Sequence, residues 1–289
     1  MQRYSIFNLV KNAFSGHQNW DLAWKDPAPK KQYDVVIIGG GGHGLATAYY
    51  LAKEHNITNV AIIEKGWIGG GNVGRNTTII RSNYMHDDNA LFSEFGMDLW
   101  RKMSQDLNYN VMFSPRGIIN LAHSDAQMNV YARRGNSMRL NGIDAILLNR
   151  EQVKEIIPMA DFSENVRFPI FGGLMQPSAG TARHDAVAWG YARQADSMGV
   201  DIIQNCEVIG FDVVGGKING IRTSRGDIKV KKIGLCVAGS TNILAEKLTM
   251  TVPVRTHLLQ ACVFESWKPI LDRGVTFAAG HFYISQSDK

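Results

Sequence analysis

The sequence contains few cysteines, and none of them lies in a pattern associated with a metal or a disulfide framework. The three are Cys206, Cys236 and Cys262, among 289 residues. None belongs to a C-x-x-C pair or to a Cys/His spacing, so the common zinc motifs are excluded. Because all three lie in apolar, strand-like runs, we predict reduced cysteines in the core of a cytoplasmic protein, and no metal site.

Long apolar runs and clustered charge are also missing. No run approaches the roughly 18 to 20 apolar residues that cross a bilayer, so the sequence predicts no membrane span. The 31 basic and 26 acidic residues give a net charge of +5 that is spread along the chain. Without a basic stripe and interleaved aromatic residues, nucleic-acid binding has no support. A hydrophobic content of 45% is enough for one large or two moderate cores.

The N-terminal residues mix aromatic and charged side chains and lack the apolar core of a secretory signal. We interpret residues 1–30 as an amphipathic arm that packs on a partner or on its own domain. A cleaved transit segment is the alternative interpretation. Pro27 and Pro29 end any helix before the first predicted strand.

The strongest signal in the sequence is a strand, a glycine turn, a helix and a second strand that ends in an acid. β-Branched apolar runs predict the strands, and apolar residues at helical spacing predict the helix between them. The glycines fit G-x-G-x-x-G, and the acid can accept hydrogen bonds from a ribose. We therefore favour a dinucleotide site over a structural glycine turn, while FAD and a nicotinamide cofactor both stay open. The first strand lies at 33–38, the turn contains Gly39, Gly41 and Gly44, and the helix lies at 45–53. The second strand lies at 60–63, and the acid is Glu64.

The remaining pattern predicts an α/β fold with two interleaved domains. Glycine-containing turns at 215–216 and 225–226 predict hairpins, and hence a β-meander beside a Rossmann-like parallel sheet. The pieces between the two parts of this sheet predict a second, mixed α+β domain. We assign the nucleotide-binding domain to 31–115 and 176–248, and the mixed domain to 116–175 and 249–289. Helices are predicted at 87–108, 125–139, 151–157, 184–198 and 240–248, and strands at 111–113, 117–121, 202–211, 217–224, 228–230, 233–237 and 281–285.

Six longer stretches carry a resemblance: DVVIIGGGGHGLATAYYLAKEHNITNV, EKGWIGGGN, GRNTTIIRSNY, RGIINLAH, ARHDAVAWGYAR and MGVDIIQNCEV. Over essentially its whole length, the sequence resembles the β subunit of heterotetrameric sarcosine oxidase, within the amino-acid-oxidase-like FAD enzymes. The resemblance implies FAD at the glycine turn and makes the mixed domain a substrate domain. Members of this family continue further, so we expect the C-terminal part of both domains, and a lysine implicated in the oxygen chemistry, to lie beyond Lys289.

The resemblance also implies a set of non-covalent FAD contacts. The glycine turn would line the pyrophosphate, Glu64 would bind the ribose, and the backbone of Val208 would contact the adenine side. Residues of the glycine-rich loop at 65–84 would lie along the rest of FAD. Without the resemblance, the loop residues are turn or packing residues and Val208 is strand core. The implied FAD residues are Gly39, Gly41, Gly42, His43, Gly44, Glu64, Asn72, Thr77, Ile79 and Val208.

Arg81 is the candidate for substrate binding. A guanidinium offers a planar pair of donors to the carboxylate of an amino acid. Monomeric sarcosine oxidases resemble this chain at IIR, where the arginine holds the carboxylate. The resemblance therefore implies a substrate-binding role for Arg81, with Tyr84 shaping the same pocket. Judged on the residues alone, Arg81 is a surface arginine.

His184 opens a predicted helix, and such a histidine is ordinarily a capping or solvated residue. The resemblance implies that His184 is the covalent attachment point of a second flavin, FMN, for which a neutral imidazole supplies the nucleophilic nitrogen. Arg183 would offset the negative charge of this flavin or its phosphate. His257 lies in a matching segment and receives no role.

Together these implications predict the β subunit of sarcosine oxidase. Sarcosine would be oxidatively demethylated with FAD as the hydride acceptor. Electrons would pass to FMN and then to oxygen, giving hydrogen peroxide, glycine and methylenetetrahydrofolate or formaldehyde. The implied partners are the α, γ and δ subunits and, through the complex, tetrahydrofolate. A related FAD-dependent amine or amino-acid dehydrogenase without covalent FMN, and a non-catalytic flavin-holding subunit or partner-binding fragment, are the alternatives.

Overall fold

The computed structural model describes residues 5–18, 20, 22–163, 165–265 and 268–286. The chain forms two compact units, each built from two separate stretches of sequence. Unit 1 comprises Met1–Trp67 and Ala192–Cys236, and unit 2 comprises Ile68–Tyr191 and Val237–Lys289. The arm contains helix α1 (Ile6–Phe14), none of whose residues is buried.

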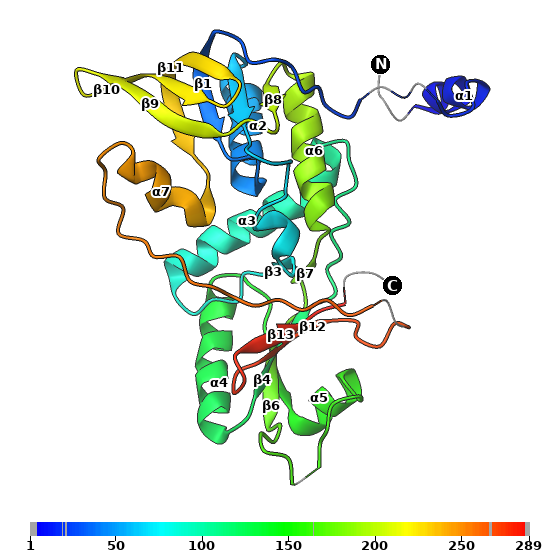
Figure 1. Ribbon diagram of the computed structural model, residues 1–289. Coiled ribbons are helices and arrows are strands. Elements are labelled where there is room, and N and C mark those ends of the chain that lie inside the picture. The colour runs from blue at the N-terminus through cyan, green and yellow to red at the C-terminus, as the bar shows by residue number, and fades with distance from the viewer. Residues whose placement is uncertain (1–4, 19, 21, 164, 266–267, 287–289) are drawn as a thin grey trace. The chain divides into compact units, whose positions relative to one another are not determined.

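Unit 1 is a six-stranded sheet with the strand order β8-β2-β1-β11-β10-β9 (Figure 1). The first four strands in this order pair in parallel, and the last two join them as an antiparallel meander. This arrangement is the predicted Rossmann-like sheet with its β-meander. The strands are β1 (Gln32–Ile38), β2 (Val60–Ile63), β8 (Asp201–Ile203), β9 (Val208–Val214), β10 (Lys217–Thr223) and β11 (Gly226–Leu235).

Helix α2 (Gly42–His55) connects β1 to β2 and packs against both strands. Its buried residues recur at steps of three and four, which places them on one helical face. Every residue of β2 is buried, as expected for a central parallel strand covered on both faces. Asn56 ends the helix in a left-handed conformation with φ of 53°.

Two strand predictions in unit 1 were wrong. The strand predicted at 202–211 is broken because Asn205 adopts a left-handed backbone conformation with φ of 50°. Its two halves, β8 and β9, therefore lie at opposite edges of the sheet. Conversely, the strands predicted at 228–230 and 233–237 form the single strand β11. The charged residues between them do not interrupt it, because β1 continues to pair with β11 there, with Val35 opposite Lys232.

Unit 2 contains a five-stranded sheet with the order β13-β12-β4-β6-β5. Helix α4 packs on one face, where its Met138 joins a buried cluster with Leu174. Helix α5 packs on the other, where Val153 joins a cluster with Ile119 and Leu121. The elements are β4 (Ile118–Ala122), β5 (Ile146–Asn149), β6 (Gly172–Gln176), β12 (Gly274–Phe277), β13 (Phe282–Ile284), α4 (Asp125–Leu140) and α5 (Arg150–Ile156).

Shorter elements complete the described chain. A two-stranded ladder joins β3 to β7 and is separate from both sheets. Helix α6 begins in unit 2 and ends in unit 1. The bounds are β3 (Ile79–Ile80), β7 (Gly180–Thr181), α3 (Asp87–Asp106), α6 (His184–Ser197), α7 (Thr241–Glu246), and the 3-10 helices η1 (Val73–Arg75) and η2 (Ala238–Ser240).

One strand prediction in unit 2 and the burial prediction for the cysteines were also wrong. Residues 111–113 form no strand, because Met112 has a φ of 54° and only the neighbouring Ser114 makes an isolated bridge, to Thr181. The cysteines were all expected in the core, but Cys262 is exposed, in a described stretch without helix or strand. Cys206 is buried as expected, and all three thiols are free.

Candidate functional site

The glycine turn in unit 1 places the start of α2 against the end of β1. Gly39 has a φ of 109°, a conformation that favours glycine. A methyl group added at Gly44 would lie 2.0 Å from the carbonyl oxygen of Gly39, so only glycine permits this close packing. The first amides of a helix have no intrahelical acceptor, and they present hydrogen-bond donors and a positive dipole end. The turn therefore forms a backbone cradle for a phosphate group.

Glu64 lies beside this turn. One carboxylate oxygen accepts a hydrogen bond from the Gly40 N–H at 2.7 Å, and the other accepts from the Gly66 N–H at 2.8 Å. Each oxygen keeps a further acceptor position, which fits a ribose hydroxyl. The backbone N–H of Cys206 donates to the Glu64 carbonyl oxygen at 2.9 Å, so the segment that leads to buried Val208 runs next to Glu64. These residues fit a bound dinucleotide.

Four further predicted FAD residues lie outside the glycines and Glu64, three of them in unit 2 and one in unit 1. Asn72 is exposed and precedes η1, and its carbonyl oxygen accepts a hydrogen bond from the Arg75 N–H at 3.2 Å. Thr77 precedes β3 and Ile79 is its first residue, and both are half-buried. Exposed His43 stands in the first turn of α2, in unit 1. Cofactor contact by each of these four residues stays a prediction.

The ladder of β3 and β7 connects the segments of Arg81 and His184 within unit 2. Ile80 pairs with Gly180, and Ile79 pairs with Thr181, in antiparallel register. Arg81 follows β3 directly, and His184 lies just beyond β7. Because the two strands run in opposite directions, the segments carrying Arg81 and His184 leave from opposite ends of the ladder.

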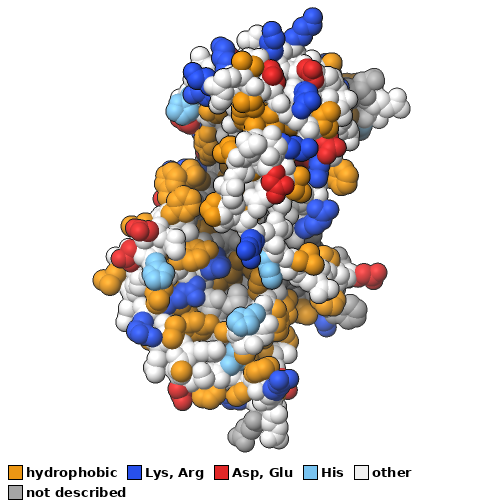
Figure 2. Space-filling model, turned by 60° about the vertical axis from the view of Figure 1, so that its left-hand side comes forward, with side chains coloured by type: hydrophobic (Ala, Val, Ile, Leu, Met, Phe, Trp, Pro, Cys, Tyr) orange, Lys and Arg blue, Asp and Glu red, His pale blue; other side chains and the backbone are white. Residues whose placement is uncertain are grey.

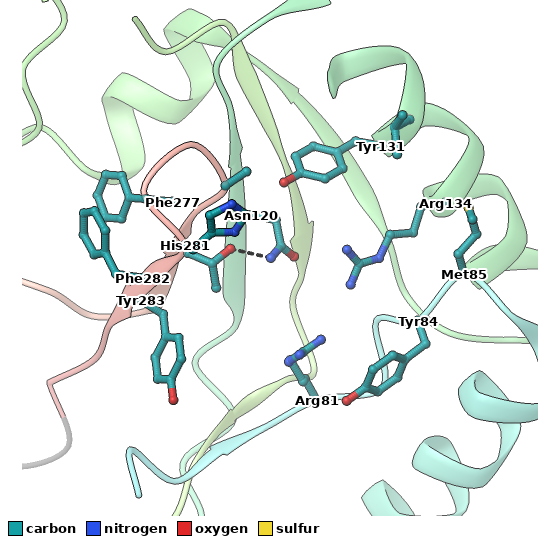
Figure 3. A pocket seen from close by; sticks show the side chains of 13 residues that line it. Arg81, Tyr84, Met85, Asn120, Tyr131, Arg134, Phe277, His281, Phe282 and Tyr283 are labelled. Carbon is teal, nitrogen blue, oxygen red and sulfur yellow. Dashed lines mark hydrogen bonds between the residues drawn. The ribbon is translucent and has the colours of Figure 1, made fainter. Parts of the chain in front are cut away.

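Arg81 lines a cavity of about 520 Å³ within unit 2. The cavity draws its walls from the segment after β3, from β4, from α4 and from the hairpin of β12 and β13 (Figure 3). Lys, Arg and His side chains gather beside a hollow in the lower half of the space-filling view (Figure 2). The lining residues are Arg81, Tyr84, Met85, Asn120, Val130, Tyr131, Arg134, Thr276, Phe277, Ala278, His281, Phe282 and Tyr283.

The predicted partners Arg81 and Tyr84 are in contact. The guanidinium carbon of Arg81 lies 4.8 Å from the centre of the Tyr84 ring, which is a cation–π distance. One terminal nitrogen of Arg81 donates to the side-chain oxygen of Asn83 at 2.5 Å. The contacts with Tyr84 and Asn83 together fix the direction of the guanidinium.

Asn83 belongs to a buried chain of polar groups that the sequence did not reveal. Asn83 is fully buried, and its side-chain nitrogen donates to the side-chain oxygen of Asn120 at 2.7 Å. Asn120 donates in turn to the hydroxyl of Thr276. From α4, a terminal nitrogen of Arg134 donates to the backbone carbonyl of Asn83. Asn83 thus contacts two guanidiniums.

Arg134 is a second cation in the cavity. Burial, and the positive charge of Arg81, lower the pKa of Arg134 from its usual value. A signal for Arg134 was present in the sequence, because an arginine on the helical face that also carries Tyr131 and Met138 cannot point freely into solvent.

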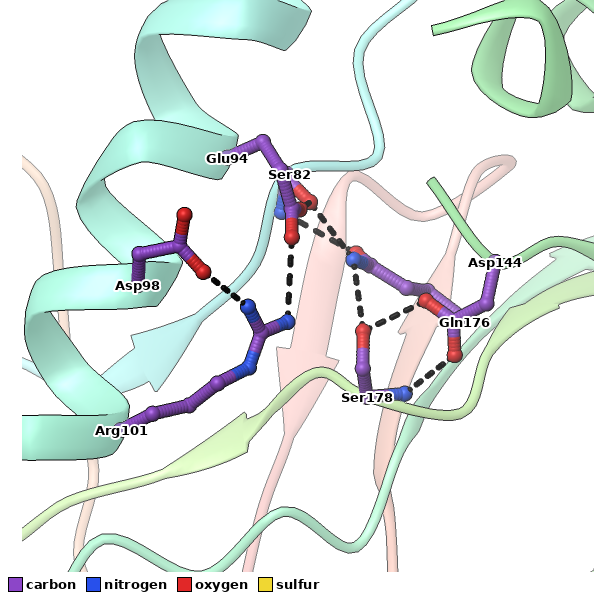
Figure 4. A network of polar contacts seen from close by, with 7 residues as sticks. All are labelled: Ser82, Glu94, Asp98, Arg101, Asp144, Gln176 and Ser178. Carbon is purple, nitrogen blue, oxygen red and sulfur yellow. Dashed lines mark hydrogen bonds and ion pairs between the residues drawn. The ribbon is translucent and has the colours of Figure 1, made fainter. Parts of the chain in front are cut away.

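A second polar network holds the segment next to Arg81 (Figure 4). Buried Ser82 receives a hydrogen bond from Gln176 and donates one to Glu94 at 2.6 Å. The backbone N–H of Ser82 donates to the Gln176 side chain at 3.0 Å. Glu94 is also paired with Arg101 at 3.0 Å. The network ties the residue after Arg81 to both β6 and α3.

His184 is half-buried at the start of α6. Its Nδ1 accepts a hydrogen bond from the Asp185 N–H at 2.8 Å. The Nε of Arg183 donates to the Asp185 carboxylate at 3.1 Å. Arg183 and His184 therefore share Asp185 as a partner.

Within the described ranges, no helix is both long and apolar enough to cross a membrane. Among the same residues, no group of three or more His, Cys, Asp or Glu is arranged to hold a metal ion.

Comparison with known proteins extends the structural evidence. The family described as FAD dependent oxidoreductase matches residues 34–289. Sarcosine oxidase subunit beta from Rhizobium meliloti is 58% identical over 99% of this chain and 69% of that protein. The protein of the same name from Rhodobacter capsulatus is 50% identical over all of this chain and 70% of that protein.

A solved structure shares the fold. L-proline dehydrogenase from P. horikoshii superposes with a TM-score of 0.78 at 24% identity, over 89% of this chain and 68% of that one. The family match agrees with the glycine turn and the parallel sheet. The chain therefore belongs to the FAD dependent oxidoreductase family, within its group of sarcosine oxidase β subunits.

Proposed function

We propose that this chain is the catalytic flavin subunit of an enzyme that oxidises sarcosine. The observation that carries the proposal is the cavity of unit 2, in which Arg81 is fixed by Asn83 and Tyr84 and no lining residue is acidic. A guanidinium held in this way is a ready partner for the carboxylate of an amino acid. The two relatives named sarcosine oxidase subunit beta support sarcosine as that amino acid.

The geometry supports a role for each of several residues of the cavity. Arg81 binds the carboxylate and thereby orients the N-methyl group. Tyr84 limits the rotation of Arg81 through their stacked contact. Phe277 and Phe282, which stack with ring centres 4.5 Å apart, provide an apolar wall that favours the methyl group and excludes water. FAD, when bound, supplies the acceptor for the two electrons and the hydrogen removed from the methyl carbon.

The first cofactor proposal concerns FAD. In unit 1, the glycine turn holds the pyrophosphate of FAD and Glu64 binds its ribose, supported by the fit of both features to a dinucleotide. We include Asn72, Thr77, Ile79 and Val208 as further FAD contacts on the strength of the family resemblance.

The finer proposal adds a second flavin. FMN would be attached covalently to His184, with Arg183 beside it, and electrons would pass from FAD to FMN and then to oxygen. The products would be hydrogen peroxide and glycine, with the one-carbon unit going to tetrahydrofolate or released as formaldehyde. The word subunit in the relatives' names supports assembly with other chains. The three free thiols support a cytoplasmic location.

The sarcosine proposal is tested by three related compounds. Anaerobic loss of flavin absorbance is followed in the intact protein after addition of sarcosine, methylamine or glycine. Sarcosine should bleach the flavin. Methylamine lacks the carboxylate that Arg81 binds and glycine lacks the N-methyl group, so both should fail at matched concentrations. Equal bleaching by sarcosine and methylamine would refute the role of the carboxylate.

The second flavin is tested by acid precipitation of the intact protein, with and without His184→Ala. Covalent FMN predicts flavin in the precipitate of the wild type and its loss in the variant, while FAD appears in the supernatant of both. If all wild-type flavin is released, a single-flavin dehydrogenase becomes the better interpretation.

A further inference from the structure

Arg134 points into the cavity from helix α4, whereas Arg81 points into it from the segment after β3 (Figure 3). Both guanidiniums donate to Asn83. Arg81 donates to the side-chain oxygen of Asn83, and Arg134 donates to the backbone carbonyl of Asn83. Fully buried Asn83 therefore acts as a shared support that holds the two groups toward one space. Arg81 belongs to the segment after β3 and Arg134 to α4, so neither position follows from the other in the sequence.

The charge of this space is unbalanced. The lining residues include two arginines and a histidine but no aspartate or glutamate. Within the described part of the chain, neither Arg81 nor Arg134 forms an ion pair, and the buried Nε of Arg134 has no hydrogen-bond partner. Placing guanidinium groups out of water without a counter-ion is costly, so the arrangement favours an anion between them.

We infer that Arg134 is a second carboxylate-binding group, so that the amino-acid substrate is held by two guanidiniums instead of one. This inference rests on the proposed function, because it assigns both groups to the substrate of the same cavity. Two guanidiniums select for a carboxylate more strongly than one, since each adds charge-assisted hydrogen bonds. The ligand class is a small amino acid or another monocarboxylate.

Arg134 also has a structural contact, the hydrogen bond to the Asn83 carbonyl, and the test must separate the two roles. Arg134→Gln keeps a side-chain donor for that carbonyl but removes the charge. Arg134→Met removes both. Arg133→Met is the matched control, because Arg133 is the preceding residue of the same helix and is exposed outside the cavity lining.

The experiment is a titration of the FAD-loaded, intact protein with acetate, followed by the change in flavin absorbance, together with sarcosine kinetics. Loss of a hydrogen bond to a charged group corresponds to about ten- to hundredfold in affinity. Both Arg134→Gln and Arg134→Met should weaken acetate binding by that factor and raise the KM for sarcosine, with a smaller change in kcat. Arg133→Met should match the wild type.

The outcomes separate this inference from the proposed function. If Arg134→Gln binds acetate as well as the wild type, the role of Arg134 is structural and the inference is overturned. If Arg81→Met loses acetate binding while both Arg134 variants keep it, the inference fails and the proposed function stands. If none of these variants affects acetate or sarcosine, the proposed function fails as well. Should Arg134→Met not fold, Arg134→Gln decides alone.

Discussion

In unit 1, the glycine turn and Glu64 belong to one uninterrupted strand, helix and strand, whereas the cavity of unit 2 draws on four separate stretches of chain. The first site is made mainly of backbone: amide donors, a positive φ and close glycine contacts. The second is made of side chains that hold one another through buried asparagines. A backbone site depends on single glycines, and an assembled site depends on the residues that connect its walls.

The largest effect is expected from Gly44→Ala in unit 1. The added methyl group would lie 2.0 Å from the Gly39 carbonyl oxygen, so the turn must open or the helix must move. We expect a loss of about 3 kcal/mol in the free energy of unfolding, and loss of FAD binding. Denaturant unfolding and flavin content after gel filtration measure the two effects.

Gly96→Ala in α3 provides the control, since a methyl group at Gly96 meets no atom within 4 Å and Gly96 lies outside the proposed FAD contacts. It should retain wild-type stability and flavin content. If Gly44→Ala behaves like this control, the turn does not depend on close glycine packing, and the contrast between the units disappears.

The next effect is expected from Asn83→Ala in unit 2. The change removes the side-chain partner of Arg81 and leaves Asn120 with an unpaired acceptor. We expect a loss of about 2 kcal/mol in stability and a rise in the KM for sarcosine, with FAD content unchanged. Asn89→Ala, at an exposed position of α3, should change neither quantity. An unchanged KM in Asn83→Ala would show that Arg81 is positioned by other contacts.

The smallest effect is expected from Tyr33→Phe, at the start of the unit 1 sheet. The Tyr33 hydroxyl donates to the Asp201 carboxylate at 2.8 Å and accepts from the Lys30 N–H at 3.0 Å. Burial of the ring raises the pKa of Tyr33, so the hydroxyl stays protonated and donates at all ordinary pH values. Thermal unfolding should report a loss of about 1 kcal/mol, with unchanged FAD binding. A loss of flavin would mean that the N-terminal end of β1 supports the cofactor site directly.

The two units also differ in how well their sites could be predicted. Unit 1 follows from local pattern, because the glycine spacing, the helical period and the terminal acid lie in one stretch. In unit 2, Arg81 and Tyr84 were identified through a family resemblance, and Asn83, Asn120 and Arg134 were missed. Their closeness depends on packing and on strand register, such as the pairing of Asn120 with Thr276, which local spacing does not encode.

The strand errors have a similar origin. Asn205 looks compatible with an extended run, yet its left-handed conformation separates β8 from β9. Lys231 looks like a break, yet its ion pair with Asp34 at 2.6 Å joins β11 to β1. The Asn205 N–H donates to the Gly66 carbonyl oxygen at 2.8 Å, so both residues contact groups outside the local sequence window.

The most direct test of the account is rapid mixing of sarcosine with the FAD-loaded Arg81→Met variant without oxygen. We expect wild-type FAD content, because Arg81 is not among the proposed FAD contacts, and an apparent Kd for sarcosine raised by on the order of a hundredfold or more, because a buried carboxylate loses its charged partner. An unchanged Kd with normal flavin reduction would contradict the claim that the unit 2 cavity binds the substrate through Arg81.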